Sequence, residues 1–405
     1  MERAYEYRIY PNAKQREQIE NTFGACRWVW NLCLETSKAA WEVNRKSLPA
    51  YELMKFLTVW KRTVAPWLYD IDNKALQSSI ANLWRAYQNF FRRVRRGEKP
   101  GYPKFKSRRA STQSYTSKYN KGTSVIRGNK VMIPKVGLVK CKVSRIPDGR
   151  IVNVTVKRTA TGKYFAVFCC MDCPEPDTPM GNEPIIGIDA GLHDLMTRSD
   201  GMKVENHRHL RMSERKLKRA QRSLSRKKKG SNNYKKQRKR LAAIHERIAN
   251  QRKDAIHNAT TDAVRESQAI AVEDLNVAGM EKNHHLAKSV TDASMSEMIR
   301  QLEYKCRWYG HQFVKVDRWF PSTQVCGKCG EITGPKGSSG LNVRKWICPS
   351  CGATHDRDIN AARNIARKGA EILGIPWDAR EYKACGEDKN LAPSAILDEA
   401  GIPRL

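Results

Sequence analysis

Residues 184–191 read Pro-Ile-Ile-Gly-Ile-Asp-Ala-Gly, a short apolar run that ends in Asp189. A second apolar run, Ala-Ile-Ala-Val-Glu-Asp-Leu, ends in Glu273, and Asp358 opens the helical pattern Asp-Ile-Asn-Ala-Ala-Arg-Asn-Ile. Such runs predict buried strands, which would fix the position of the acid at each end. Two strand-end acids and one helix-borne acid could hold divalent metal for phosphodiester chemistry. The alternative for Asp189 is an ordinary turn, which Asp-Ala-Gly would also suggest.

The charge of the chain indicates a polyanionic partner. Lys and Arg number 75 against 41 Asp and Glu, a net charge of +34 spread along 405 residues. Nucleic acid fits this excess, because neutralising phosphates releases condensed counterions. Together with the three acids, this favours a metal-dependent nuclease. We find no apolar run of about 18 residues and no signal peptide, so we expect a soluble protein of two to four domains that is not exported.

Four of the twelve cysteines form the pattern C-x2-C-x18-C-x2-C, at Cys326, Cys329, Cys348 and Cys351. Thiolates at this spacing can close a tetrahedral zinc site, and the glycine after each pair permits a tight turn. Four protein ligands leave no open position, so we expect the zinc to be structural. The other eight cysteines are scattered, unlike those of a secreted disulfide scaffold, and we interpret them as small buried hydrophobic side chains.

The N-terminal part of the chain changes its periodicity between segments. Runs with a period of two, typical of short antiparallel strands, lie at 5–9, 130–133, 152–156 and 164–168. They fit a small barrel or sandwich better than a parallel sheet. We therefore expect a β-barrel built from residues 1–10 and 113–180, with residues 11–112 inserted as a helical domain.

Two helices are predicted within this insertion, one capped by Asn12 and one starting near Asp72. The second ends in a strongly cationic segment that contains Arg92 and Arg93. The following loop, residues 100–106, is basic and aromatic and includes Lys104 and Lys106. Such a loop suits contacts with phosphates and stacked bases. An ordinary turn with solvated lysines remains an equal alternative.

The most basic stretch spans residues 208–253, with 19 Lys or Arg and only two acids. Apolar positions at helical spacing lie on both sides of Gly230-Ser231-Asn232-Asn233, which predicts a helical hairpin. Like charges at this density would destabilise a hairpin without a polyanion, so we favour nucleic-acid contact over a solvated face. The candidate contacts are Arg222, Arg226, Lys227 and Lys228.

These motifs together resemble the TnpB family, the transposon-encoded RNA-guided nucleases that are similar to the RuvC half of type V CRISPR effectors. The resemblance lies in Gly-Ile-Asp-Ala-Gly at 187–191, Ala-Val-Glu-Asp-Leu at 271–275, the cysteine pattern and His-Asp-Arg-Asp-Ile-Asn-Ala-Ala at 355–362. It extends to Tyr10-Pro11-Asn12, to residues 23–31 and to Ala75-Leu76-Gln77, which resemble the family's wedge and recognition segments. It covers the chain up to about residue 375.

The resemblance implies a multidomain α+β fold. A wedge β-barrel would carry the helical recognition insertion, and an RNase H-like (RuvC) α/β nuclease domain would span 181–320 and 354–375, interrupted by a zinc ribbon at 321–353. Residues 376–405 would form a tail. The nuclease domain would bring Asp189, Glu273 and Asp358 together around two Mg2+ ions. Three clustered carboxylates repel one another, so without metal at least one should have a raised pKa.

The resemblance also implies the partners. A guide RNA from the transposon end would supply specificity by base pairing, and the protein would read a short motif that flanks the double-stranded DNA target. Tyr51 and Gln77 hold positions that could face this DNA. We expect a monomeric ribonucleoprotein in a prokaryotic cytoplasm. A nuclease-inactive RNA-guided repressor and a conventional transposase are the alternatives, although a repressor would be expected to lose one of the three acids, and all are present.

Overall fold

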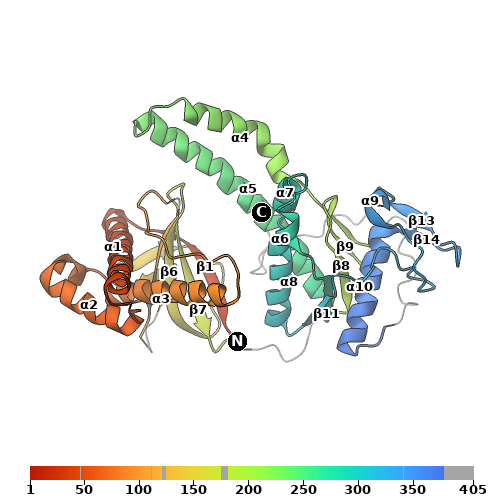
Figure 1. The fold of residues 1–405 in the computed structure, drawn as a ribbon, viewed down its shortest axis with the longest axis horizontal. Coiled ribbons are helices and arrows are strands. Elements are labelled where there is room, and N and C mark those ends of the chain that lie inside the picture. The colour runs from red at the N-terminus through yellow and green to blue at the C-terminus, as the bar shows by residue number, and fades with distance from the viewer. Residues whose placement is uncertain (46, 111, 121–124, 175–180, 341, 378–405) are drawn as a thin grey trace. The chain divides into compact units, whose positions relative to one another are not determined.

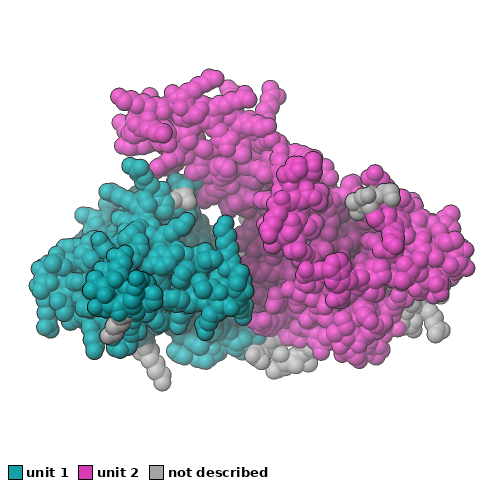
Figure 2. All heavy atoms as spheres, in the orientation of Figure 1, with its two compact units in different colours: residues 1–174, 396–405 teal, residues 175–395 magenta. Residues whose placement is uncertain are grey.

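The computed structural model describes residues 1–377 except 46, 111, 121–124, 175–180 and 341. The chain divides into two compact units, whose described parts are residues 1–174 and 181–377 (Figure 2). The predicted tail, residues 376–405, lies outside the described residues from 378 onward. Among the described helices, none has the length and apolar character needed to span a bilayer.

Unit 1 contains a seven-stranded antiparallel sheet in the order β2-β6-β7-β1-β5-β4-β3 (Figure 1). Its strands are β1 (Arg3–Tyr10), β2 (Gln113–Lys118), β3 (Ile126–Arg127), β4 (Lys130–Ile133), β5 (Gly137–Cys141), β6 (Arg150–Arg158) and β7 (Tyr164–Met171). All four predicted strands are therefore confirmed, and β1 pairs with β7 and β5 although more than 100 residues separate them. The pairing order of the described strands is open at β2 and β3. A barrel stays a prediction.

The helices of unit 1 all come from the segment between β1 and β2. They are α1 (Ala13–Asn44), α2 (Ala50–Thr63), the 3-10 helix η1 (Pro66–Asp70) and α3 (Asn73–Arg95). The predicted cap at Asn12 is confirmed, since Asn12 and Gln15 form a reciprocal capping box at α1. The helix predicted to start near Asp72 is α3, and the Asp72 side chain accepts from its backbone. The apolar faces of these helices share one core with the sheet, where Phe23 of α1 meets Tyr115 of β2.

Unit 2 is built on a mixed five-stranded sheet in the order β10-β9-β8-β11-β12. The strands are β8 (Ile186–Asp189), β9 (Asp194–Arg198), β10 (Lys203–Glu205), β11 (Ala269–Glu273) and β12 (Gln312–Val316). Strands β8, β11 and β12 are parallel to one another. Strand β9 pairs antiparallel with both β8 and β10. Apolar side chains on both faces of β8 and β11 explain why these strands read as unbroken apolar runs.

Helices cover both faces of this sheet. One face packs on α5 (Asn232–Glu266) and α8 (Met295–Tyr309), and the other on α10 (Arg357–Leu373). The remaining elements are α4 (His209–Ser225), α6 (Val277–Met280), α7 (Ala287–Ala293), α9 (Gly337–Gly340), β13 (Lys345–Ile347) and β14 (Thr354–Asp356). The unit is therefore a three-layer α/β structure, with a small two-stranded ribbon inserted before α10.

The predicted helical hairpin is confirmed as α4 and α5, which lie side by side in Figure 1. Its second arm is longer than predicted and ends at Glu266 instead of 253. The physical reason is packing: the extra turns carry Ile256, Ala263 and Val264, which are buried against the sheet of unit 2.

Candidate metal centre and nucleic-acid interface

Asp189 and Glu273 lie side by side at the ends of neighbouring parallel strands. Strand β8 pairs with β11 in a register that joins Gly187 to Ala271 and Ile188 to Val272, so the next residues are the two acids. Side chains alternate along a strand, so both acids lie on the same face as Gly187 and Ala271. That face is the one covered by α10.

Helix α10 brings Asp358 to the same edge of the sheet. A Cβ atom on Gly187 would lie 2.1 Å from the Ala362 carbonyl oxygen, and one on Gly369 would lie 3.2 Å from the Cδ1 atom of Ile185, two residues earlier in the chain than Gly187. The helix therefore runs antiparallel to β8, and its first turn lies at the level of the strand ends. Asp358 is buried there, with 8% of its surface exposed.

We expect Gly187→Ala to disrupt this edge. The added methyl group would force α10 away from β8, which should lower the free energy of unfolding by about 1–3 kcal/mol and displace Asp358. Chemical denaturation measures the change. Gly24→Ala is the matched control, because its Cβ would meet only the end of the Arg27 side chain, at 3.8 Å. Unchanged stability in Gly187→Ala would contradict the close approach.

As predicted, at least one of the three acids has a raised pKa. Burial, followed by the charges of Asp358 and Glu273, raises the pKa of Asp189 to about 7. Burial also raises the pKa of Glu273. Among the described residues, the carboxylates do not form a group whose ligand atoms all lie within 4.8 Å of one another. Both oxygens of Asp358 are held instead by arginines, at 2.7 Å by Arg344 and 2.8 Å by Arg357.

The raised pKa of Asp189 predicts a pH-dependent loss of stability in EDTA. Below pH 3.8, its ordinary pKa, the carboxyl is protonated whether the chain is folded or unfolded. Between there and about 7, the unfolded chain releases the proton and the folded chain retains it, so rising pH destabilises the fold. At pH 8, Asp189→Asn should therefore be more stable than the unsubstituted protein by about 2 kcal/mol, a value reduced for partial solvent exposure. Urea denaturation measures this difference, and a difference that does not vary with pH would contradict the shift.

The acids adjacent to the candidate ligands have structural partners. Asp356 caps α10 by accepting from the Asp358 and Ile359 amides, and it pairs with Lys203 of β10 at 2.8 Å. Asp274 pairs with Arg318 at 2.7 Å. Asp356 therefore fixes the backbone at the start of α10, and Asp274 links the residue after Glu273 to the turn after β12.

Sequence reasoning missed the side chains that support α10 and Asp358. The Asn364 amide donates to the carbonyls of Ser322 and Val325, and Asn360 donates to Val325 and accepts from the Gly327 amide. These contacts tie the loop after β12 and the first cysteine turn to α10. Two asparagines one helical turn apart, on a face of Ala and Ile, were the available signal. Arg344, Arg357 and Lys203 gave none, because their partners depend on the tertiary fold.

The four cysteines converge as predicted. Their sulfur atoms all lie within 4.8 Å of one another, and the Cys326–Cys351 and Cys329–Cys348 separations are 3.6 and 3.7 Å. A tetrahedron with Zn–S bonds of about 2.3 Å has edges of about 3.8 Å, so the cluster has the size of a zinc–thiolate site. The Thr333 hydroxyl lies 3.2 Å from the Cys348 sulfur and lowers the pKa of this thiol to about 6. His355 lies 3.1 Å from the Cys326 sulfur.

The remaining cysteines follow the expectation of buried apolar side chains. Cys26, Cys33, Cys141, Cys170, Cys173 and Cys306 are buried, Cys169 is half-buried, and Cys385 lies outside the described residues. Burial raises the pKa of the Cys26 and Cys306 thiols to about 12, which makes them poor nucleophiles.

The basic loop at 100–106 is fastened to helix α1. The Trp30 indole donates to the Lys104 carbonyl, and the Asn31 side chain bonds both backbone groups of Lys106. The Lys106 ammonium lies 3.9 Å from the centre of the Trp30 ring, and burial lowers its pKa. Lys106 is therefore in contact with Trp30 within unit 1, and both Lys104 and Lys106 are exposed.

The other candidate contacts in unit 1 are placed differently. Tyr51, at the start of α2, is 59% exposed and hydrogen-bonds Glu52, and Gln77 of α3 is half-buried. Arg92 and Arg93 are exposed in the last turn of α3. Both arginine side chains are therefore accessible to phosphate groups.

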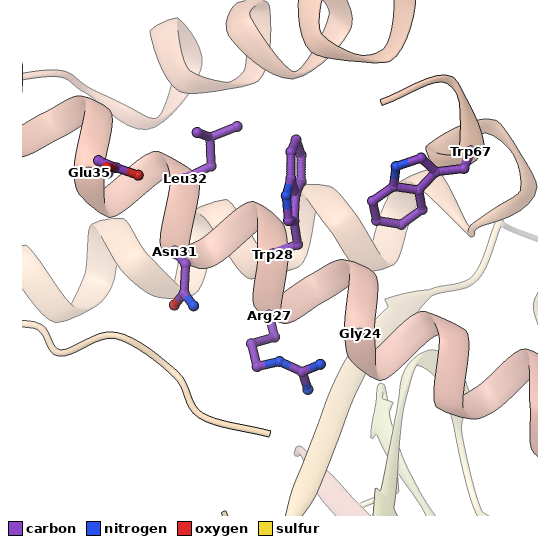
Figure 3. A pocket seen from close by; sticks show the side chains of 7 residues that line it. All are labelled: Gly24, Arg27, Trp28, Asn31, Leu32, Glu35 and Trp67. Carbon is purple, nitrogen blue, oxygen red and sulfur yellow. The ribbon is translucent and has the colours of Figure 1, made fainter. Parts of the chain in front are cut away.

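A hollow of about 400 Å³ lies beside the fastened loop. It is lined by Gly24, Arg27, Trp28, Asn31, Leu32, Glu35 and Trp67 (Figure 3). Trp28 and Leu32 project from one side of α1 and Arg27 and Asn31 from another. Arg27 donates to Gln113 and Asn31 holds the loop, so these polar groups have partners within unit 1.

In unit 2 the predicted cations lie at the tip of the hairpin. Arg222 is in the last turn of α4, Arg226 follows it, and Lys227 and Lys228 lead towards α5; all four side chains are exposed. The Gln237 side chain donates to the Ala220 carbonyl and joins the two arms. The Ser231 hydroxyl accepts from the Tyr234 amide and fixes the start of α5. The cations therefore project from an ordered support.

Three family models match segments of this chain. A family model described as "Probable transposase" matches residues 168–284, "Cas12f1-like, TNB domain" matches 296–365, and "Helix-turn-helix domain" matches 1–46. The described part of the last segment contains one strand and one long helix, β1 and α1, instead of a helical pair joined by a turn.

Full-length relatives are found as well. A Streptomyces pristinaespiralis protein named "Putative RNA-guided DNA endonuclease" is 37% identical, covering 100% of this chain and 99% of its own length. An Escherichia coli K12 protein, "Putative RNA-guided DNA endonuclease InsQ", is 32% identical over 95% and 94%. The fold resembles the protein in a Cas12f1–sgRNA–target DNA complex, with a TM-score of 0.53 at 13% identity over 90% and 98% of the two chains.

Proposed function

This chain belongs to the TnpB family, and we propose that it is an RNA-guided DNA endonuclease encoded by a transposable element, which cuts its target next to a short flanking motif. The observation that carries this proposal is the edge of the unit 2 sheet where Asp189 and Glu273 face the helix that bears Asp358. The names of the full-length relatives agree with it. We further propose that unit 2 is an RNase H-like nuclease domain and unit 1 a wedge and recognition domain.

The donor set at this edge fits Mg2+. Carboxylate oxygens are the ligands that this hard cation prefers, and a bound cation would offset the burial and the repulsion that raise the pKa of Asp189. Asp189, Glu273 and Asp358 would hold two such ions, which supply an activated water and a stabilised leaving oxygen. The chain supplies the positioning: Asp356 fixes the first turn of α10, and Arg344 and Arg357 orient the Asp358 carboxylate.

The zinc ribbon would act structurally. Strand β13 pairs with β14 in a register that joins Lys345 to Asp356, and the Arg357 amide donates to the Arg344 carbonyl. The fold of the ribbon therefore sets the position of Arg344 and of the start of α10. We propose that zinc held by the four cysteines maintains this connection.

RNA-guided recognition would use the basic surfaces. A heteroduplex is bound through its backbone, which requires cations and little base readout. The exposed arginines and lysines of the hairpin tip and of the end of α3 meet this requirement. Exposed Tyr51 and half-buried Gln77 would contact the flanking DNA.

The test separates RNA guidance from its alternatives. Protein purified with its own transcript flank should retain a defined RNA, and RNase treatment in EDTA should abolish binding to DNA that matches this RNA. Binding that is unaffected by RNase would contradict the proposal and favour a conventional transposase. RNA-dependent binding without cutting in Mg2+ would favour the nuclease-inactive repressor.

A further inference from the structure

The turn after β12 lies beside the candidate metal centre. Strand β12 pairs with β11 in a register that joins Val316 to Glu273, so residues 317–320 leave the sheet at the edge that carries the acids. The Asp274 amide donates to the Val316 carbonyl, and Arg318 pairs with the Asp274 side chain. The turn is therefore connected directly to the residue after Glu273.

Local contacts hold this turn in one conformation. Asp317 accepts from the backbone amides of both Trp319 and Phe320, and Phe320 packs on the core between the sheet and α10. The loop continues to Ser322 and Val325, whose carbonyls accept from the α10 asparagines. Both ends of the turn are thus attached to elements that carry candidate ligands.

Trp319 points away from this support into solvent. Its side chain is 83% exposed, the highest fraction among the large apolar residues of the described chain. Within these residues, no aromatic ring and no cation packs on its indole ring. An exposed tryptophan loses favourable burial, and the adjacent Phe320 shows that the turn can bury an aromatic side chain. The exposure of Trp319 therefore requires an explanation beyond folding.

We propose that Trp319 stacks on an unpaired base of the DNA strand that enters the metal centre. This inference rests on the proposed function and adds a binding residue to it. An indole ring accepts any base, which suits an enzyme whose sequence specificity comes from elsewhere. Lys328, further along the same loop, is exposed and provides positive charge for the strand. Stacking next to the acids would hold the strand so that a phosphodiester faces them.

The test measures stacking and cutting separately. Full-length protein in buffer without Mg2+ or chelator is titrated with short single-stranded DNA that carries one 2-aminopurine, whose fluorescence falls when it stacks on an aromatic ring. With the Trp319→Ala variant, 2-aminopurine at one position of the DNA should regain the fluorescence of an unstacked base. The dissociation constant for the DNA should rise about tenfold. Trp319→Phe should retain most of the quenching and most of the affinity for DNA. Ile372→Ala is the matched control, because Ile372 is 53% exposed at the opposite end of α10 from Asp358, and it should behave like the unsubstituted protein.

Each outcome has a defined meaning. Loss of stacking in Trp319→Ala, with retention in Trp319→Phe and slower cutting by the alanine variant in Mg2+, supports the inference. Equal fluorescence, binding and cutting in all variants overturns it, as does quenching that occurs only with RNA of the same sequence. Failure of the unsubstituted protein to cut, with Trp319-dependent quenching intact, counts against the proposed endonuclease and not against stacking.

Discussion

Asp189→Ala should abolish DNA cutting while RNA and target binding remain nearly intact. The carboxyl lies at the end of β8, beside Glu273 and opposite the first turn of α10. Its removal takes away one of the three acids that would hold Mg2+, but no basic contact. We expect a fall in the single-turnover cutting rate of at least about 1,000-fold, equivalent to about 4 kcal/mol in the barrier. Binding is measured in parallel by filter retention.

The matched control is Asp254→Ala, which removes an exposed acid from α5 in the same unit. It should cut at the unsubstituted rate. Loss of binding together with cutting in Asp189→Ala would mean that this residue supports the fold, and it would undo the assignment. In EDTA at high pH, Asp189→Ala should also have a larger free energy of unfolding than the unsubstituted protein. Burial and the neighbouring acids disfavour the ionised Asp189 carboxyl, and the substitution removes it.

Cys348→Ser should remove zinc and, with it, cutting. A hydroxyl is a poor replacement for a thiolate, and structural zinc contributes on the order of 10 kcal/mol of apparent binding free energy to small zinc domains. Cys348 directly follows β13, so loss of the site should loosen the β13–β14 pair that precedes Asp358. The zinc content measured by elemental analysis should fall from one zinc per chain to none, and the cutting rate should fall with it.

Cys169→Ser is the control for this substitution, because Cys169 is half-buried on β7 of unit 1 and lies outside the cluster. It should keep one zinc and normal cutting. Retention of a full equivalent of zinc by Cys348→Ser, with unchanged activity, would contradict a structural zinc.

Local sequence signals predicted the elements of the fold but not all of their extents. The caps at Asn12 and Asp72 and the strands of unit 1 follow from side-chain chemistry within a few residues. The length of α5 does not, because its last turns are defined by burial against a sheet whose strands come from distant segments. The pairing of β1 with β5 and β7 likewise depends on tertiary packing, although the shared period of two suggested it.

The candidate site shows the same division. Asp189, Glu273, Asp358 and the four cysteines could be predicted because their chemistry requires those residue types next to buried strands or tight turns. The register of β8 and β11 makes two of the acids neighbours, a relation that spacing in the sequence does not give. The arginines that hold Asp358 and the asparagines of α10 could not be predicted, since each acts on a partner brought near by the fold. Lys106 lies on Trp30, and its contact with phosphate stays a prediction.

The most direct test of RNA-guided cutting at this carboxylate edge is plasmid cleavage with a changed guide. Protein purified with its own transcript flank, in which the guide segment is replaced, is mixed with plasmids that carry either the old or the new target. The account predicts Mg2+-dependent cutting of the new target alone, with none in EDTA and none with Asp189→Ala. Cutting that ignores the guide, or that persists in EDTA or in Asp189→Ala, would contradict it.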